Sequence, residues 1–256
     1  MPVITLASAS GSPGVTTAAL GLAESWPRPV VLVEADPTGG SGILAGFLRG
    51  EVEPAGGLLE LVMAQRNGAI EVSPEVLMPL MDGRVRLLPG IRAHSQARSL
   101  ASVWEPLLTA LRNATGVTGQ DVIVDAGRLG LNGWPEPLVR GSDITVLVTR
   151  SSLPALAAAR SWLDELRHDN PLLGVVVVGA GRPYSAREVA RWLRVPVFGE
   201  VAWDPGSAAA FSDGAQRPRR FDHSGFARSL RTVGEGLRAR CVAVDLDEEQ
   251  KVRGVR

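Results

Sequence analysis

The chain has 256 residues, 45% of them hydrophobic, and its 27 Lys and Arg residues balance 27 Asp and Glu residues. This length and composition suit a well-packed core, and the zero net charge excludes a general electrostatic attraction to nucleic acid or anionic membranes. A single cysteine, Cys241, excludes an internal disulfide. The N-terminus lacks the basic region of a signal peptide, and no stretch approaches the ~20 apolar residues of a membrane-spanning helix, so we expect a cytoplasmic protein.

Short runs rich in Val, Ile and Leu alternate with helical patterns along the chain. The predicted strands, in chain order, are 3–7, 29–34, 84–89, 121–125, 143–149, 173–179 and 195–201. The predicted helices are 16–24, 58–66, 99–114, 153–167, 186–194 and 225–241. Nearly continuous apolar strands are typical of a parallel sheet covered on both faces. The pattern predicts one α/β domain over 1–241, doubly wound, with about seven mostly parallel strands and helices on both faces; the charged tail 242–256 is expected to be disordered.

Small residues, carboxylates and arginines follow the predicted strands. SASGSPGVTT follows the first strand, EADPTGGSG the second and DAGRLG the fourth, and TRSSLP, GAGRPYS and AWDPGS follow the last three. Ligands bind beyond the carboxyl ends of the strands in an open parallel sheet. These segments are therefore expected to meet at one ligand-binding edge.

The order of these segments resembles the ParA/MinD family of deviant-Walker P-loop ATPases. SGSPGVTT (10–17) is similar to the family's loop KGGVGKTT, VVLVEADPTGG (30–40) to its D-x-D-P motif, and DVIVDAG (121–127) to the strand that ends in its Walker B acid. LLPGIR (87–92) and VPVFGEVAWDP (195–205) resemble two further stretches. The resemblance covers roughly the first 240 residues. It implies a P-loop NTPase-like fold, with ATP or ADP and Mg²⁺ as cofactors if the site still binds them.

The predicted phosphate-binding loop is incomplete. Gly11 and Gly14 permit the tight backbone that aims N–H groups at phosphate oxygens, ahead of a helix N-terminus. The family's two loop lysines align with Ser10 and Val15, and Pro13 removes one N–H donor. A charged hydrogen bond is worth about 1.5–3 kcal/mol, and phosphoryl transfer depends on positioning and charge stabilisation. We therefore expect ATP hydrolysis to be lost or very weak.

The acidic positions of the family are better retained. The resemblance makes Asp36 the second acid of D-x-D, near the attacking water, and Asp125 the Walker B acid, while Glu34 replaces the first acid with a longer side chain. Thr16 stands where the family has its Mg²⁺-binding hydroxyl. Thr16, Asp36 and Asp125 are the predicted Mg²⁺ ligands, and Asp36 the vestigial or weak catalytic residue. The alternative for each acid is a turn or a helix N-cap.

The remaining predicted site residues come from the loop and from two later strand ends. The predicted nucleotide-binding residues are Gly11, Ser12, Gly14, Val15, Thr16, Thr17, Arg182, Asp204 and Pro205. Arg128, Arg150 and Arg182 follow strands and could each bind a phosphate bidentately in place of lysine. Because every cation except Lys251 is arginine, most arginines are expected to lie in solvent. Trp134 and Trp203 fall near the same edge.

The sequence leads to one main functional hypothesis and two alternatives. The first is a pseudo-ATPase of ParA/MinD type that acts through protein contacts, with a homodimer as one form, in positioning or assembling a larger machine of the pilus, secretion or partition kind. The second is an active Mg-ATP-hydrolysing ATPase in which arginine replaces the lysines. The third is a partition factor that binds DNA non-specifically through the basic segment 216–231, which the neutral charge disfavours.

Overall fold

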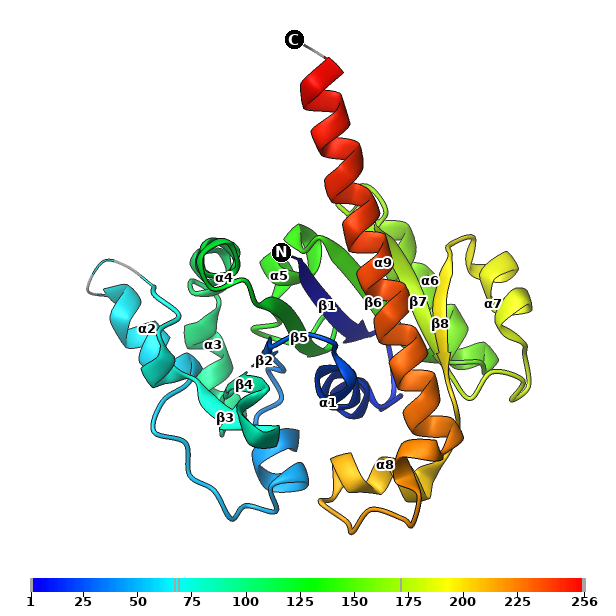
Figure 1. Ribbon diagram of the computed structural model, residues 1–256, viewed down its shortest axis with the longest axis horizontal. Helices are drawn as coiled ribbons and strands as arrows, with labels where there is room; N and C mark the ends of the chain where they lie inside the picture. Colours follow the sequence, from blue (N-terminus) through cyan, green and yellow to red (C-terminus); the bar gives the residue numbers. More distant parts are fainter. Residues whose placement is uncertain (1, 67, 69, 171, 255–256) are drawn as a thin grey trace.

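The protein is built around one mixed, mostly parallel sheet (Figure 1). The structure is a computed structural model and describes residues 2–66, 68, 70–170 and 172–254. For residues 114–118 and 243–254 it describes the backbone only. Within these residues the sheet has eight strands in the order β3-β4-β2-β5-β1-β6-β7-β8, all parallel except that β3 runs antiparallel to β4. The strands are β1 Val3–Ser8, β2 Val30–Glu34, β3 Met78–Leu80, β4 Val85–Leu88, β5 Asp121–Arg128, β6 Ile144–Arg150, β7 Leu173–Val178 and β8 Val197–Val201.

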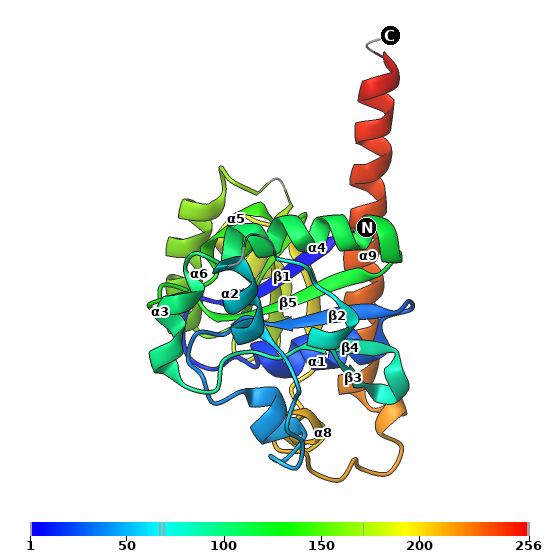
Figure 2. The ribbon, with the colours of Figure 1, turned by 90° about the vertical axis from the view of Figure 1, so that its left-hand side faces the viewer.

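Helices cover both faces of the sheet (Figures 1 and 2). They are α1 Val15–Ser25, α2 Leu58–Arg66, α3 Ala97–Leu100, α4 Trp104–Thr118, α5 Glu136–Gly141, α6 Leu153–Leu166, α7 Ala186–Leu193, α8 Pro205–Ser212 and α9 Gly225–Gly254. Alternate side chains of one strand reach opposite layers: Ile4 and Leu6 pack with α1, α8 and α9, whereas Val3 packs with α2, α3 and α4. This two-sided burial is why the strands are nearly continuous in apolar residues.

The predicted fold class is confirmed, with differences at the sheet edge and in the short helices. The additional strand is β3, three residues long and containing Pro79, which no apolar run marks in the sequence. Pro fits such an edge strand because it lacks the N–H that a central strand would need. The predicted helix 99–114 is divided between α3 and α4, and the short helices α5 and α8 were not predicted.

Helix α9 differs from the sequence-based expectation in its length. Leu230, Val233 and Leu237 of α9 are buried, as the helical stripe predicted. The helix continues to Gly254, through part of the segment predicted to be disordered, and its C-terminal half projects away from the body in both views (Figures 1 and 2). Disorder of 242–256 in solution stays a prediction. No helix in the described part of the chain is long and apolar enough to cross a membrane.

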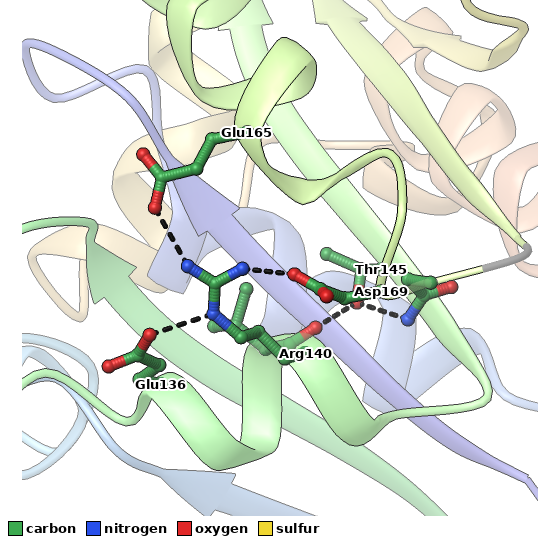
Figure 3. A network of polar contacts seen from close by, with 7 residues as sticks. Glu136, Arg140, Thr145, Glu165 and Asp169 are labelled. Atoms are coloured by element: carbon green, nitrogen blue, oxygen red, sulfur yellow. Dashed lines mark hydrogen bonds and ion pairs between the residues drawn. The ribbon is translucent and has the colours of Figure 1, made fainter.

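An ion-pair network around Arg140 joins α5 to α6 and to the turn that follows α6 (Figure 3). The guanidinium contacts Glu136 and Glu165 at 2.7 Å each, and it also contacts Asp169. The Arg140 side chain is 27% exposed, so solvent screens this cation less than an isolated surface arginine.

Arg140→Ala is expected to lower the free energy of unfolding by about 1 kcal/mol, because one cation serves three acids in a network. Arg167→Ala is a matched control, since Arg167 contacts a single acid, Asp164, and is 43% exposed; its loss is expected to be within about 0.5 kcal/mol. Urea denaturation measures both variants. Equal losses would show that the network adds nothing beyond an ordinary surface pair.

Candidate functional site

The loop between β1 and α1 has the backbone of a phosphate-binding loop. Gly11 and Gly14 both have positive φ, +64° and +95°, a region that side chains with a Cβ seldom adopt. Helix α1 begins directly after Gly14, and no side chain caps it. The N-terminus of α1 therefore presents its backbone N–H groups and its partial positive charge toward the loop.

The Val15 side chain is buried in the apolar core. It is 6% exposed and packs in the apolar cluster beneath the sheet, with residues such as Ile4 and Ala18. Pro13, also buried, contributes no N–H to the loop. The loop thus has a buried apolar side chain at the position that the resemblance assigns to lysine.

Asp125 lies in the C-terminal half of β5, which continues to Arg128 instead of ending at Asp125 as the sequence predicted; it is fully buried and is paired in register with Glu34 of β2. Its Oδ1 accepts a hydrogen bond from the Gly127 N–H at 3.0 Å, while Oδ2 makes no hydrogen bond of normal geometry within the described residues. Burial raises the pKa of Asp125 to about 7; the nearby Thr16 hydroxyl opposes this rise, and Asp36 and Glu34 add to it. The buried orphan oxygen beside the first turn of α1 is suited to a cation.

Asp36 lies half-buried in the loop after β2. Its Oδ1 accepts hydrogen bonds from the Thr38 N–H at 2.8 Å and the Thr38 hydroxyl at 2.7 Å. The carboxylate lies against Gly127, where a Cβ would come within 2.2 Å of the Asp36 Cγ. Gly127, with φ +61°, therefore allows Asp36 to approach the end of β5. The turn role left open for Asp36 in the sequence is real, and it brings the acid beside Asp125.

Glu34 holds the segment after β2 in place. The Ser41 hydroxyl lies 2.9 and 2.8 Å from its two carboxylate oxygens, and the Ile43 and Gly90 N–H groups donate to it at 3.2 and 3.1 Å. Burial raises its pKa against these hydrogen bonds. Between Ser41 and Ile43, a Cβ on Gly42 would lie 3.3 Å from Thr16 Cγ2, so Glu34 positions this segment against α1.

A cavity of about 330 Å³ opens between the N-terminus of α1 and the ends of β7 and β8. Its polar lining includes Ser12, Gly14, Thr17, Arg150 and Asp204, and its apolar lining includes Val178, Val201, Trp203, Pro205 and Phe226. Of the predicted nucleotide-binding residues, Ser12, Gly14, Thr17, Asp204 and Pro205 therefore line one cavity. Gly11, Val15, Thr16 and Arg182 are not in that lining.

The residues beside this cavity have distinct roles. Asp204 caps α8 by accepting from the Ser207 N–H at 3.0 Å and hydroxyl at 2.6 Å, the N-cap alternative for a strand-end acid. Arg182 lies close by, with its guanidinium carbon 6.0 Å from the centre of the Trp203 ring. Trp134 instead packs against Trp162 at 5.4 Å between ring centres. Phe226, near the start of α9, also lines the cavity. The sequence analysis did not predict it as a site residue, because the helical pattern marks Phe226 only as part of the apolar stripe of α9.

The predicted metal ligands come from three segments: Thr16 from α1, Asp36 from the loop after β2, and Asp125 from β5. In the described part of the chain, no three His, Cys, Asp or Glu side chains are placed to enclose a metal ion by themselves. Mg²⁺ needs no such enclosure, because it is commonly bound by one or two carboxylates together with water and substrate phosphates. The unpaired oxygen of Asp125, the Thr16 hydroxyl and Asp36 fit that kind of donor set.

The basic segment 216–231 is partly occupied by internal contacts. Arg217 pairs with Glu24 and stacks on Phe221 at 4.7 Å, and Arg231 donates to the Asp222 carbonyl at 3.4 Å. Arg217 and Arg231 therefore make contacts within the protein, in addition to any contact with DNA that the basic segment could make.

Solved structures with the same architecture were found by comparison. The cell division ATPase MinD of Pyrococcus furiosus matches with a TM-score of 0.73 and 18% identity, over 93% of this chain and 98% of that one. A ParA family ATPase of Chlorobium tepidum TLS matches with 0.71 and 14%, over 92% and 98%. The septum site-determining protein MinD of Pyrococcus horikoshii OT3, complexed with Mg-ADP, matches with 0.70 and 17%, over 92% and 95%. No family profile and no curated protein matches the chain.

The mostly parallel sheet, the glycine-containing loop before α1, and the pairing of Glu34 at the end of β2 with Asp125 of β5 are features of a P-loop NTPase-like α/β fold. Within that class, this chain has the fold of the MinD and ParA ATPases. The predicted resemblance and fold class are thereby confirmed.

Proposed function

We propose that this chain is a ParA/MinD-like protein that acts through protein contacts in positioning or assembling a larger machine, and that its ATP hydrolysis is lost or very weak. The observation that carries the proposal is Val15, an apolar side chain packed into the core at the position where the resemblance calls for the phosphate-binding lysine. A supplied cation can be worth about 10³–10⁵ in the rate of phosphoryl transfer. Its loss affects hydrolysis far more than folding.

A role in positioning is supported by the printed descriptions of proteins with this fold, which include a septum site-determining protein and a cell division ATPase. We extend that role to this chain as part of the proposal, with a pilus, secretion or partition system as the kind of machine served. A homodimer that forms without ATP belongs to the same proposal, because Ser10 occupies the place of the lysine that would reach a partner's nucleotide. The cytoplasmic location stays a prediction.

A bound Mg-nucleotide would be held by the chain's own residues at two places. The first-turn amides of α1 and the Thr17 hydroxyl would bind phosphate oxygens, and Thr16 with Asp125 would hold Mg²⁺. The metal would neutralise the charge on the phosphates. Asp36, bonded to Thr38, would orient water near the end of β5.

One observation favours the alternative of an active ATPase. Arg150 donates from Nη2 to the Ser12 carbonyl at 3.3 Å, so one arginine does reach the loop. Arg150 lines the cavity beside the loop, whereas Val15, at the position of the phosphate-binding lysine, is buried in the apolar core. We therefore keep the hydrolysis-deficient protein as the main proposal.

With saturating Mg-ATP, the wild-type chain is expected to release no more phosphate than the buffer blank. Asp36→Asn is expected to give the same result, since no turnover remains for Asp36 to support. A continuous phosphate-release assay measures both proteins, and thermal unfolding checks that both are folded. Turnover in the wild type at a rate typical of MinD and ParA ATPases that Asp36→Asn abolishes would overturn the proposal, and turnover at that rate that Arg150→Ala also abolishes would establish the arginine-assisted alternative.

A further inference from the structure

A second cavity, of about 410 Å³, lies at the C-terminal end of α1, between that helix, Arg84 before β4 and the segment from α8 to α9. Helix α1 has 11 residues, so its two ends are about 15 Å apart. Among the described residues, none that lines this cavity also lines the 330 Å³ cavity beside the phosphate-binding loop. The 410 Å³ cavity is therefore a separate place for a ligand.

The buried part of the lining is apolar. Phe211, Phe221 and Leu230 are buried, and the rings of Phe211 and Phe221 meet edge to face with 5.9 Å between their centres. Gly21 of α1 lies against Leu230 of α9, where a Cβ would collide with the leucine side chain. Small-molecule sites typically have volumes of about 300–1,000 Å³, with apolar walls and a few polar groups that fix the orientation of the ligand. The size and the apolar wall of this cavity suit a small organic molecule.

The exposed part of the lining is charged, and one of its arginines is used internally. Arg217 forms an ion pair with Glu24 of α1, whose side chain is 27% exposed. The Arg217 guanidinium carbon also lies 4.7 Å from the centre of the Phe221 ring and 5.6 Å from that of Phe211. Arg217 therefore neutralises Glu24 and fixes the segment after α8 against α1.

The other two arginines of the lining, Arg84 and Arg231, are bonded to neutral groups. Arg84 donates from Nη2 to the Trp26 carbonyl at 3.2 Å, and Arg231 donates from Nη2 to the Asp222 carbonyl at 3.4 Å. None of the ion pairs in the described part of the chain includes either arginine. Because a guanidinium has five N–H donors, each side chain is held by one bond and retains donors for an anion.

The balance of charge around the cavity is positive. Asp222 is the remaining acid of the lining, and it is exposed. Since Glu24 is paired with Arg217, two arginines remain against this one acid. Arg84 precedes β4 and Arg231 belongs to α9, so the two cations come from segments far apart in the chain. An anion with two charges fits this arrangement better than one with a single charge, because each arginine can bind its own oxygen atoms.

We propose that this cavity binds a small organic anion with two negative charges and a compact apolar body, of the phosphate monoester or dicarboxylate class. Arg84 and Arg231 bind the anionic oxygens, and the buried rings of Phe211 and Phe221 contact the body of the ligand. The proposal goes beyond the proposed function and does not depend on it, because the cavity shares no lining residue with the one beside the phosphate-binding loop.

Calorimetric titration of the full chain at pH 8 in EDTA, without nucleotide, tests the proposal. Phenyl phosphate and phthalate are the two main probes, and both are doubly ionised at this pH. At least one of them is expected to bind at submillimolar concentration, and the tighter of the two identifies the anionic group. Benzoate, which has one charge, and inorganic phosphate, which has no apolar body, are expected to bind at least about tenfold more weakly than that probe.

Arg84→Gln and Arg231→Gln each remove a charge but keep an amide N–H for the backbone carbonyl that the arginine contacts. Each is expected to weaken the tighter probe at least about tenfold, through the loss of a charged hydrogen bond. Arg228→Gln is the matched control, because Arg228 is an exposed arginine of α9 that does not line the cavity. Its effect should stay within about twofold. Thermal unfolding without ligand checks that the three variants are folded.

Three results would overturn the proposal. The first is no binding of either dianionic probe at millimolar concentration. The second is wild-type affinity in both Arg84→Gln and Arg231→Gln. The third is an equal loss in Arg228→Gln and Arg231→Gln, which would assign the binding to general attraction by the basic segment 216–231. Phosphate release from ATP is measured separately, so none of these results bears on the proposed function.

Discussion

The metal-free protein is expected to be more stable at pH 5.5 than at pH 8, by about 2 kcal/mol in the free energy of unfolding. The cause is Asp125, whose pKa is raised by burial from 3.8 to about 7. Between these values the folded chain holds a proton that the unfolded chain has released, so stability falls as pH rises through that window. A difference of about 1.5 pH units within it corresponds to about 2 kcal/mol.

Other acids do not reverse this expectation. The pKa of Glu34 is also raised by burial, so Glu34 acts in the same direction. The pKa values of Asp204 and Glu188 are lowered, chiefly by hydrogen bonds from Ser207 and Ser185, and stability from these acids is lost only at lower pH, as they become protonated.

Asp125→Asn is expected to remove most of the pH dependence and to stabilise the protein at pH 8, because the amide carries no charge into the core. Asn keeps an oxygen that can accept from the Gly127 N–H. Asp164→Asn, at an exposed acid of α6, is the control and should leave the slope unchanged. Urea denaturation in EDTA at several pH values gives the result. If the free energy of unfolding of Asp125→Asn still falls between pH 5.5 and pH 8, a group other than Asp125 causes the pH dependence.

Val15→Lys is expected to tighten the binding of Mg-ATP by at least about tenfold. The new ammonium would stand at the position that the resemblance assigns to the phosphate-binding lysine and would add a charged hydrogen bond to phosphate. The longer side chain replaces a valine that is 6% exposed, so a stability loss of about 1–3 kcal/mol from overpacking is expected. Turnover should not return, because Ser10 still stands at the second lysine position.

Val15→Met is the matched control for this substitution, since methionine is about as long as lysine but uncharged. Titration with Mg-ATP compares the two variants, and thermal unfolding confirms that both are folded. The same gain in both would attribute the effect to altered packing of the loop. A gain in Mg-ATP affinity only in Val15→Lys would show that the wild-type loop binds weakly because it lacks a positive charge, and not because of its packing.

Several features of the site follow from local sequence alone. The apolar runs predicted a two-sided parallel sheet, and the order of SGSPGVTT (10–17), Asp36 and Asp125 predicted that the loop and two acids share one edge. These predictions succeeded because strand burial and parallel order are set by short apolar segments. The absence of lysine at Ser10 and Val15 is likewise a fact of the sequence.

Tertiary structure alone decided which groups meet and what they do. Arg128, Arg150 and Arg182 are indistinguishable in the sequence as strand-end arginines. The structure shows that Arg150 donates a hydrogen bond to the Ser12 carbonyl of the loop and lies against the Trp203 ring. The elevated pKa of Asp125 depends on complete burial beside other acids, which strand pairing produces. Distances and burial between residues far apart in the chain arise from packing, which no local pattern encodes.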